Sequence, residues 1–187
     1  MADILSLARE LSPDGEGEGG TDGLPVDQWN PERCGEMDLV IKADGSWVHE
    51  GSEITRASLV KLFSRVLRRD DTPDGEGGYV LVTPAEKLDI TVEDAPFLAV
   101  DYERTGDGLA FRTNVGDVVT AGPDHPITMR RSEHAGARVP YVLVRGGLEA
   151  RLARPAYYRL MAEADTGEDG TLSVTSGGER FVLGRPE

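Results

Sequence analysis

Short segments that favour β-strands follow one another through most of this chain, and each is bounded by Gly, Asp or Pro. The first two, MDLVI at 37–41 and SWVHEG at 46–51, are joined by Asp44-Gly45, which predicts a β-hairpin. This spacing favours antiparallel pairing, with a meander in the middle of the chain. The remaining runs lie at 79–84, 89–94, 96–103, 109–114, 116–122, 140–145, 148–153, 171–176 and 180–184.

Two segments interrupt the strands with helical spacing. The apolar residues Leu59, Leu62, Phe63, Val66 and Leu67 form one stripe at i, i+3, i+4, i+7 and i+8. We expect this helix to begin after an N-cap at Thr55 and to end at Asp70-Asp71. A second helix is expected from Pro155 to about Ala164, because proline suits the first helical turn.

The surroundings of the two helices repeat. The segment ITRASLVKLF at 54–63 aligns with LARPAYYRLM at 152–161, and the dipeptide Val82-Thr83 recurs as Val174-Thr175 after the second helix. This order predicts a duplicated α+β core of two subdomains, built from antiparallel strands with one main helix in each half. The tetrapeptide YVLV occurs at 79 and at 141, out of this register, and is interpreted as coincidence.

The chain divides into three predicted regions. Residues 1–25 hold a short amphipathic helix over 2–11 and an acidic, glycine-rich linker at 12–25. Residues 26–95 form an N-terminal α+β subdomain, and residues 96–187 form a β-rich C-terminal subdomain with one helix.

The charge and the rare residue types exclude several classes of function. With 34 acidic and 20 basic residues the net charge is −14, which argues against nucleic acid and anionic membranes as partners. The single cysteine, Cys34, and the three histidines lack metal-ligand spacing, so we predict no metal and no cofactor. No run of about 18 apolar residues and no leader is present, which favours a cytoplasmic protein. No catalytic motif is found, and the prediction leans away from an enzyme.

Two arginines stand at the starts of the two predicted helices. Arg56 and Arg154 lie where the helix dipole disfavours a cation, so something should compensate for their placement. One interpretation is a salt bridge to Glu93, Asp94 or Glu149. The other is an anion held by arginine and the helix N-terminus. The sequence leaves both open.

Further donors lie at strand ends: Lys87, Arg112, Asn114 and Arg145. If they converge on a cleft between the halves, they suit a phosphorylated ligand, with Trp47 or Tyr157 as a stacking face. The alternative places Trp47, Tyr157 and Tyr158 in the core, where Tyr158 is the stronger candidate.

An ordered string of motifs extends from Trp29 to Gly184. It contains WNP at 29–31, MDLVIKADGSWVHEGSEITRASLVKLFSRVLR from 37, YVLVTPAEKLDITVEDAPFLAV from 79, FRTNVGD from 111 and PYVLVRGGLEARLAR from 140. This string resembles a bacterial family known as domain of unknown function 1285. The resemblance implies a duplicated core, a C-terminal half superficially similar to a pleckstrin-homology fold, and a nucleotide-like ligand at the interface of the halves. It also implies a link to signal transduction. It supplies no catalytic residues.

The sequence therefore predicts a ligand-binding module that senses a small anionic or nucleotide-like molecule between its two halves. The predicted ligand-binding residues are Trp47, Arg56, Lys87, Arg112, Asn114, Arg145 and Arg154. Arg145 and Arg154 are expected to clamp the anion. The alternative is a protein-interaction module without a small ligand, acting on a protein partner or as a homodimer. A third hypothesis is an enzyme whose site the sequence hides.

Overall fold

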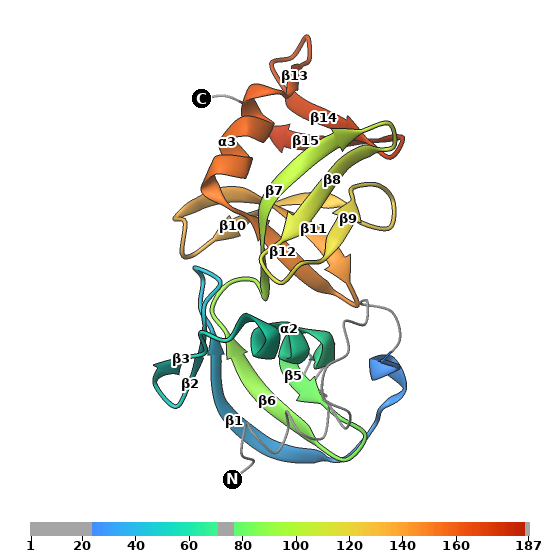
Figure 1. Ribbon diagram of the computed structural model, residues 1–187. Helices are drawn as coiled ribbons and strands as arrows, with labels where there is room; N and C mark the ends of the chain where they lie inside the picture. Colours follow the sequence, from blue (N-terminus) through green and yellow to red (C-terminus); the bar gives the residue numbers. More distant parts are fainter. Residues whose placement is uncertain (1–23, 71–76, 186–187) are drawn as a thin grey trace. The chain divides into compact units, whose positions relative to one another are not determined.

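A computed structural model of the protein describes residues 24–70 and 77–185 (Figure 1). The helix predicted over 2–11, and nearly all of the linker predicted at 12–25, lie outside these residues. The chain divides into two compact units: residues 1–42 with 46–93, and residues 43–45 with 94–187. Within the described residues, neither α-helix has the length and apolar character needed to cross a membrane.

The N-terminal unit is a curled six-stranded sheet with one α-helix against it (Figure 1). The strand order is β3-β2-β1-β6-β5-β4. The predicted hairpin is confirmed, because Ile41 pairs with Trp47 and Val40 with Val48 in antiparallel register. Its elements are the 3₁₀-helix η1 (Val26–Gln28), β1 (Arg33–Ile41), β2 (Trp47–His49), β3 (Ser52–Glu53), α2 (Ala57–Val66), β4 (Leu67–Asp70), β5 (Gly78–Val82) and β6 (Lys87–Val92).

The C-terminal unit contains a second six-stranded sheet, of order β10-β11-β12-β7-β8-β9, and a three-stranded sheet, of order β13-β14-β15. Helix α3 follows β12 directly and lies beside β7 (Figure 1). The elements are β7 (Phe97–Thr105), β8 (Gly108–Thr113), β9 (Val118–Thr120), β10 (Ile127–Ser132), β11 (Ala137–Arg145), β12 (Leu148–Leu152), α3 (Arg154–Ala162), β13 (Asp165–Thr166), β14 (Leu172–Ser176) and β15 (Glu179–Gly184).

The two large sheets have the same topology, which confirms the predicted duplication. Adding six to each strand number of the first sheet gives β9-β8-β7-β12-β11-β10, which is the order of the second sheet read from its other edge. In both sheets the first and last strands form the central pair and run parallel, β1 with β6 and β7 with β12, while the other pairs are antiparallel. The meander predicted for the middle of the chain is therefore wrong in extent, because β6 and β7 belong to different sheets.

The register of the predicted repeat is also wrong. Helix α2 lies between the third and fourth strands of its unit, whereas α3 follows the sixth strand, so the two helices are not equivalent. The equivalent segments are instead the two YVLV runs, which form β5 and β11, the fifth strands of the two sheets. Each run starts with a tyrosine that has a guanidinium over its ring: Arg69 lies 5.8 Å from the centroid of Tyr79, and Arg130 lies 3.6 Å from that of Tyr141.

Helix α2 is shorter than its apolar stripe predicts. It begins after Arg56 instead of Thr55 and ends at Val66. Leu67 adopts extended backbone angles (φ −71°, ψ 132°) and pairs with Leu81, so the last residue of the stripe is buried as a strand residue. The four residues of β4, Leu67–Asp70, pair with β5, so their backbone groups form sheet hydrogen bonds. As a last helical turn, the same residues would leave carbonyl groups without partners.

Each unit has its own apolar interior. The largest fully buried side chains of the N-terminal unit include Trp47, Phe63, Leu39 and Ile41. Those of the C-terminal unit are Tyr141, Phe97, Phe111, Leu109, Leu148, Leu152 and Leu160. Burial of this kind contributes about 1.5–3 kcal/mol for each large apolar side chain, so each sheet and its helix form a rigid support for the residues at its rim.

Candidate functional site

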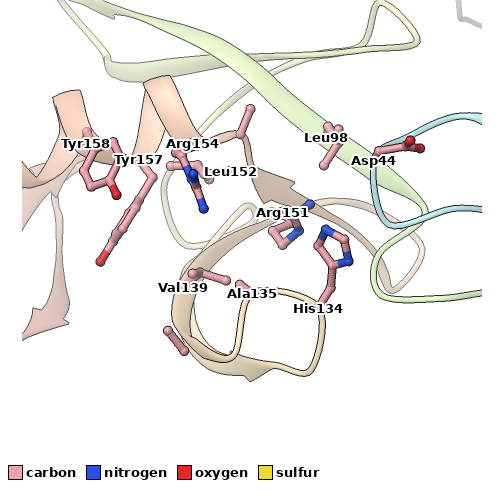
Figure 2. A pocket seen from close by; sticks show the side chains of 12 residues that line it. Asp44, Leu98, His134, Ala135, Val139, Arg151, Leu152, Arg154, Tyr157 and Tyr158 are labelled. Atoms are coloured by element: carbon pink, nitrogen blue, oxygen red, sulfur yellow. The ribbon is translucent and has the colours of Figure 1, made fainter.

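A cavity of about 410 Å³ lies in the C-terminal unit, where the start of α3 meets the end of β12 and the turn between β10 and β11 (Figure 2). This volume is in the range of small-molecule sites. The cavity combines basic, aromatic and apolar side chains. Its lining consists of Asp44, Leu98, His134, Ala135, Ala137, Val139, Arg151, Leu152, Ala153, Arg154, Tyr157 and Tyr158.

Helix α3 begins in the wall of this cavity without a cap. Its N-cap Ala153 has extended angles (φ −64°, ψ 150°), no side chain caps the helix, and its first turn holds no acid. The N–H groups of a first turn have no partners within the helix and carry the positive end of its dipole. The helix start therefore presents a positive potential to the cavity.

Arg154 is the first residue of α3 and increases this potential. Its side chain is exposed, and among the described residues it makes no hydrogen bond or ion pair. The acids that the sequence offered as partners of Arg56 and Arg154 bind other cations: Glu93 binds Lys42 at 2.8 Å, Asp94 binds Arg151 at 2.7 Å, and Glu149 binds Arg130 at 2.9 Å. The salt-bridge interpretation of the two arginines is thus not supported within the described part of the chain.

Arg151, the other arginine of the cavity, is neutralised by Asp94. The Asp94 side chain is 6% exposed and also accepts hydrogen bonds from the hydroxyls of Tyr141 (2.7 Å) and Ser132 (3.2 Å). Burial, together with the neighbouring Asp94 carboxylate, raises the pKa of Tyr141 to about 12, although a hydrogen bond with Ser132 opposes the shift. Tyr141 therefore stays a neutral donor to Asp94.

Two neighbouring tyrosines on α3 provide the aromatic surface of the cavity. The ring centroids of Tyr157 and Tyr158 are 5.6 Å apart, and Tyr158 is 62% exposed. The prediction that Tyr158 is the stronger core candidate is wrong. The buried residues of α3 are Ala156 and Leu160, at i and i+4. At about 100° per residue, this spacing places Tyr157 on a flank of the helix and Tyr158 on the face opposite the buried residues.

Trp47 is not available for stacking. Its side chain is 1% exposed in the interior of the N-terminal unit, and its Nε1 has no hydrogen-bond partner in the described structure. The sequence prediction therefore assigned the exposed and the buried aromatic residue the wrong way round. β2 starts at Trp47, directly opposite the buried Ile41, so the pleat places both side chains on the inner face.

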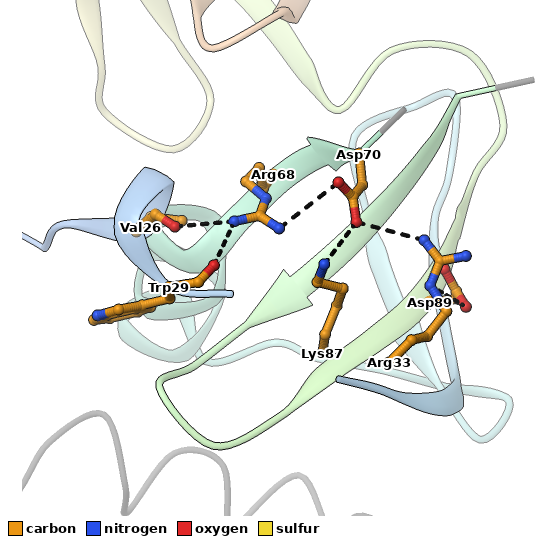
Figure 3. Close-up of polar contacts among 7 residues, drawn as sticks. All are labelled: Val26, Trp29, Arg33, Arg68, Asp70, Lys87 and Asp89. Atoms are coloured by element: carbon orange, nitrogen blue, oxygen red, sulfur yellow. Dashed lines mark hydrogen bonds and ion pairs between the residues drawn. The ribbon is translucent and has the colours of Figure 1, made fainter. Parts of the chain in front are cut away.

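Lys87 belongs to an ion-pair cluster around Asp70 in the N-terminal unit (Figure 3). Its Nζ lies 3.0 Å from the Asp70 carboxylate, which also contacts Arg33 at 3.5 Å and Arg68 at 3.7 Å. Arg68 in turn donates hydrogen bonds to the carbonyl oxygens of Val26 (3.1 Å) and Trp29 (2.8 Å). Through Asp70 and Arg68, Lys87 thus helps to hold the segment that precedes β1 against β4. The positive charge of Lys87 is already compensated by the Asp70 carboxylate.

The predicted donors of the C-terminal unit are also engaged, apart from Arg154. Arg112 is 62% exposed and lies 3.8 Å from Asp101. Arg145 forms an ion pair with Asp117, and its guanidinium lies 5.0 Å from the ring centroid of Phe97. Asn114 accepts a hydrogen bond from the backbone N–H of Leu98 (3.0 Å) and donates one to the carbonyl of Gly45 (3.3 Å), so both ends of its amide have partners.

Arg56 resembles Arg154 in its placement but not in its surroundings. It is the exposed N-cap of α2, a helix that also lacks a capping side chain and an acid in its first turn. It does not line either cavity described here. Of the seven predicted binding residues, Arg154 alone lines the C-terminal cavity, and the predicted convergence of the others between the halves stays a prediction.

A cavity of about 460 Å³ in the N-terminal unit has the opposite charge. Three carboxylates, those of Glu36, Asp38 and Glu50, line it together with His49, without any lysine or arginine. An anion would be repelled there. Among the described residues, no group of three or more His, Cys, Asp or Glu side chains is placed to hold a metal ion.

Most of the residues that line the C-terminal cavity were not singled out from the sequence, and two of them, His134 and Asp44, lie in turns. His134 lies in the turn between β10 and β11, and Asp44 lies in the turn between β1 and β2. Asp44 was recognised as a turn residue, but no local signal shows that the turn at 43–45 packs with the C-terminal unit. Such a long-range contact could be found only from the fold.

Comparisons with known proteins agree with this architecture. The profile of the DUF1285 N-terminal domain, a domain of unknown function, matches residues 24–95, and that of the DUF1285 C-terminal domain matches residues 96–183. The chain belongs to the DUF1285 family. No curated protein matches the chain.

Two solved DUF1285 structures are similar to it. The crystal structure of a DUF1285 protein from Silicibacter pomeroyi DSS-3 shares 40% sequence identity with a TM-score of 0.84, over 99% of this chain and 96% of that one. A DUF1285 protein from Shewanella baltica OS155 shares 30% identity with a TM-score of 0.53, over 69% of this chain and 94% of that one.

Proposed function

We propose that this DUF1285 protein binds a small anionic, nucleotide-like ligand in the cavity of its C-terminal unit. The observation that carries the proposal is Arg154 at the uncapped start of α3, exposed to the cavity and without an ion pair in the described structure. In a chain with 34 acids, an arginine at the positive end of a helix without a carboxylate partner is unfavourable unless an anion binds there.

The other lining residues suit such a ligand. Tyr157 and Tyr158 offer ring faces on which a planar group can stack, and Leu98, Val139 and Leu152 supply apolar walls. The cavity of the N-terminal unit lacks these features and is acidic. This supports a single anion site in the C-terminal unit instead of one site in each unit, and it differs from the interfacial site that the family resemblance implies.

The protein-interaction alternative has weaker support. The exposed valines Val118 (64%) and Val182 (55%) lie on β9 and β15, and Val118 stands opposite Arg112 in the sheet. Single exposed apolar side chains next to charged ones are common on monomeric proteins. They do not define a docking surface.

The test is isothermal titration calorimetry of the 187-residue protein with phenyl phosphate, which carries one planar ring and one phosphate. We expect saturable binding that weakens at least about tenfold in Arg154→Gln, because a charge-assisted contact is lost. Arg56→Gln is the matched control, since it removes the same charge from the other uncapped helix start. It is expected to change the affinity by less than about twofold.

Thermal unfolding of the ligand-free variants separates binding from structure. Arg154→Gln is expected to keep or slightly raise the Tm, because the arginine opposes the helix dipole and has no partner in the described structure. A clear drop in Tm would show that Arg154 stabilises the fold and would argue against a role in ligand binding. No heat of binding for phenyl phosphate, with concentration-dependent self-association in sedimentation equilibrium, would favour the interaction module.

A further inference from the structure

Arg151, the second arginine of the C-terminal cavity, is held in place through two of its three guanidinium nitrogens. Nε lies 2.7 Å from the buried carboxylate of Asp94, and Nη2 donates a hydrogen bond to the carbonyl oxygen of Ala43 at 2.7 Å. Asp94 is itself held by the hydroxyls of Tyr141 and Ser132. The orientation of the guanidinium group is therefore fixed before a ligand binds.

The third nitrogen of Arg151, Nη1, is available to a ligand. It donates no hydrogen bond to the described residues, and it is not buried. The side chain as a whole is only 12% exposed, and the cavity is the surface that it lines. Nη1 is therefore the guanidinium nitrogen that an anion in the cavity can reach.

Arg151 and Arg154 lie close together on a fixed segment of backbone. Between them, the N–H of Ala153 donates a hydrogen bond to the carbonyl oxygen of Ala99 in β7 at 2.9 Å. In Figure 2, Arg151 comes from the end of β12 and Arg154 from the start of α3, while Asp44, the acid of the lining, lies beyond Arg151 in this view. The two arginines thus line the cavity from adjoining elements.

The start of α3 offers fewer backbone donors than most helix starts. Pro155 lies in its first turn and has no N–H, so an anion there depends more on side-chain donors. A phosphate monoester presents three acceptor oxygens and can bind two guanidinium groups at once, whereas one arginine satisfies a carboxylate in a bidentate pair. Two arginines at this helix start therefore favour a phosphate over a carboxylate.

We propose that Arg151 is the second anion-binding residue of this cavity, and that Arg151 and Arg154 together select a phosphate monoester with a planar body. This inference rests on the proposed anion site and names the ligand class and the specificity residue of that site. Arg154 supplies a charge without a partner in the described structure. Arg151 supplies a directed donor whose own charge is balanced by Asp94, so it acts on the choice between anions at contact distance.

Phenyl phosphate and phenyl sulfate are a matched pair of probes for this inference. Both carry one ring and one tetrahedral anion, and at pH 8 they differ by about one negative charge. We would measure both affinities by isothermal titration calorimetry at this pH, where histidine side chains are ordinarily neutral. The wild-type protein is expected to bind phenyl phosphate at least about tenfold more tightly, because the added charge meets a second guanidinium group.

A double variant, Arg151→Gln with Asp94→Asn, assigns this preference. It removes both charges of the ion pair, so the net charge near the cavity is unchanged and no buried carboxylate is left alone. Phenyl phosphate should bind at least about tenfold more weakly, and its preference over phenyl sulfate should fall below about threefold. The control, Arg130→Gln with Glu149→Gln, removes another ion pair of the same unit outside the cavity lining and should leave both affinities unchanged.

A measurement on the wild-type protein keeps the test decisive if the double variant does not fold. In ¹H–¹⁵N spectra of the arginine side chains, the guanidinium signals of Arg151 and Arg154 should shift together and saturate at the same concentration of phenyl phosphate. The signals of Arg130 should stay in place.

The outcomes separate the two proposals. Suppose that phenyl phosphate binds in an Arg154-dependent way. If the folded double variant then keeps the wild-type affinity, if the Arg151 signals do not shift, or if phenyl sulfate binds the wild type equally well, the inference about Arg151 is overturned and the anion site stands. If phenyl phosphate does not bind, both proposals fall.

Discussion

The two units build their six-stranded sheets in the same order, but they insert their helices at different points. In the N-terminal unit α2 connects the third and fourth strands, whereas α3 of the C-terminal unit follows the sixth strand. An arginine stands at each helix start, Arg56 as the N-cap of α2 and Arg154 as the first residue of α3, and neither helix has a capping side chain. Only α3 starts in the wall of one of the two described cavities. The duplicated sheets are therefore not accompanied by duplicated cavities, because the two helices are inserted at different points of the sheet order.

The units also differ in how they use one central carboxylate. Asp70 of the N-terminal unit has a side chain that is 24% exposed and gathers three cations, and Asp94 of the C-terminal unit is 6% exposed and binds one arginine and two hydroxyls. The buried carboxylate of Asp94 should therefore matter more for the stability of its unit than the partly exposed carboxylate of Asp70.

The largest expected effect is that of Asp94→Ala. It leaves the Arg151 guanidinium without its ion pair and two hydroxyls without their acceptor, which should lower the free energy of unfolding of the C-terminal unit by about 3–5 kcal/mol. Hydrogen exchange measured by mass spectrometry on peptides of 97–152 checks this. Tyr141→Phe removes one hydrogen bond and should cost about 1 kcal/mol. A loss under about 1 kcal/mol in Asp94→Ala would contradict the central role of this carboxylate.

Asp70→Asn should destabilise the N-terminal unit by less, about 1–2 kcal/mol. Desolvation raises the pKa of Asp70, but the hydrogen bond and charge of Lys87, with Arg68 and Arg33, outweigh it and hold the pKa below its ordinary value of 3.8. A carboxyl with a lowered pKa stabilises the folded state above the unfolded pKa, and this contribution is lost as the pH falls through the folded pKa.

Urea unfolding followed by tryptophan fluorescence measures this effect, because both tryptophans, Trp29 and Trp47, lie in the N-terminal unit. The difference in the free energy of unfolding between wild type and Asp70→Asn should have its largest value near neutral pH and should shrink below pH 3.8. A difference that stays constant down to strongly acidic pH would show that the ion pairs around Asp70 do not stabilise the unit.

The sequence predicts local structure well in this protein because strand runs, turns and helix stripes are local patterns. The hairpin around Asp44-Gly45 follows from such patterns, and so does the second helix, which was expected from Pro155 and begins one residue earlier, at Arg154. The repeat register could not be found in this way. It depends on which strand pairs with which, and the true signal, YVLV in β5 and β11, was set aside because the helices suggested a different offset.

Of the residues that line the proposed site, the sequence singled out Arg154, because helix polarity is a local property, and Tyr157 as one of two candidates for a stacking face. Lys87 and Arg145 are equally basic in the sequence, but each has an acid beside it in space, Asp70 and Asp117, and these acids are 17 and 28 residues away in the chain. In the described part of this acidic chain, many of the lysines and arginines form ion pairs with carboxylates that lie far away in the sequence. The sequence therefore overestimates the number of arginines and lysines that are available for a ligand.

The most direct test compares the two helix starts in one spectrum. A ¹H–¹⁵N correlation spectrum of the wild-type protein would be recorded during titration with phenyl phosphate. We expect the backbone amides of Arg154 and Ala156 to shift and saturate together with those near His134, while those of Ala57 and Ser58 at the start of α2 stay in place. Equal shifts at both helix starts, or shifts at α2 alone, would contradict an anion site specific to the C-terminal unit.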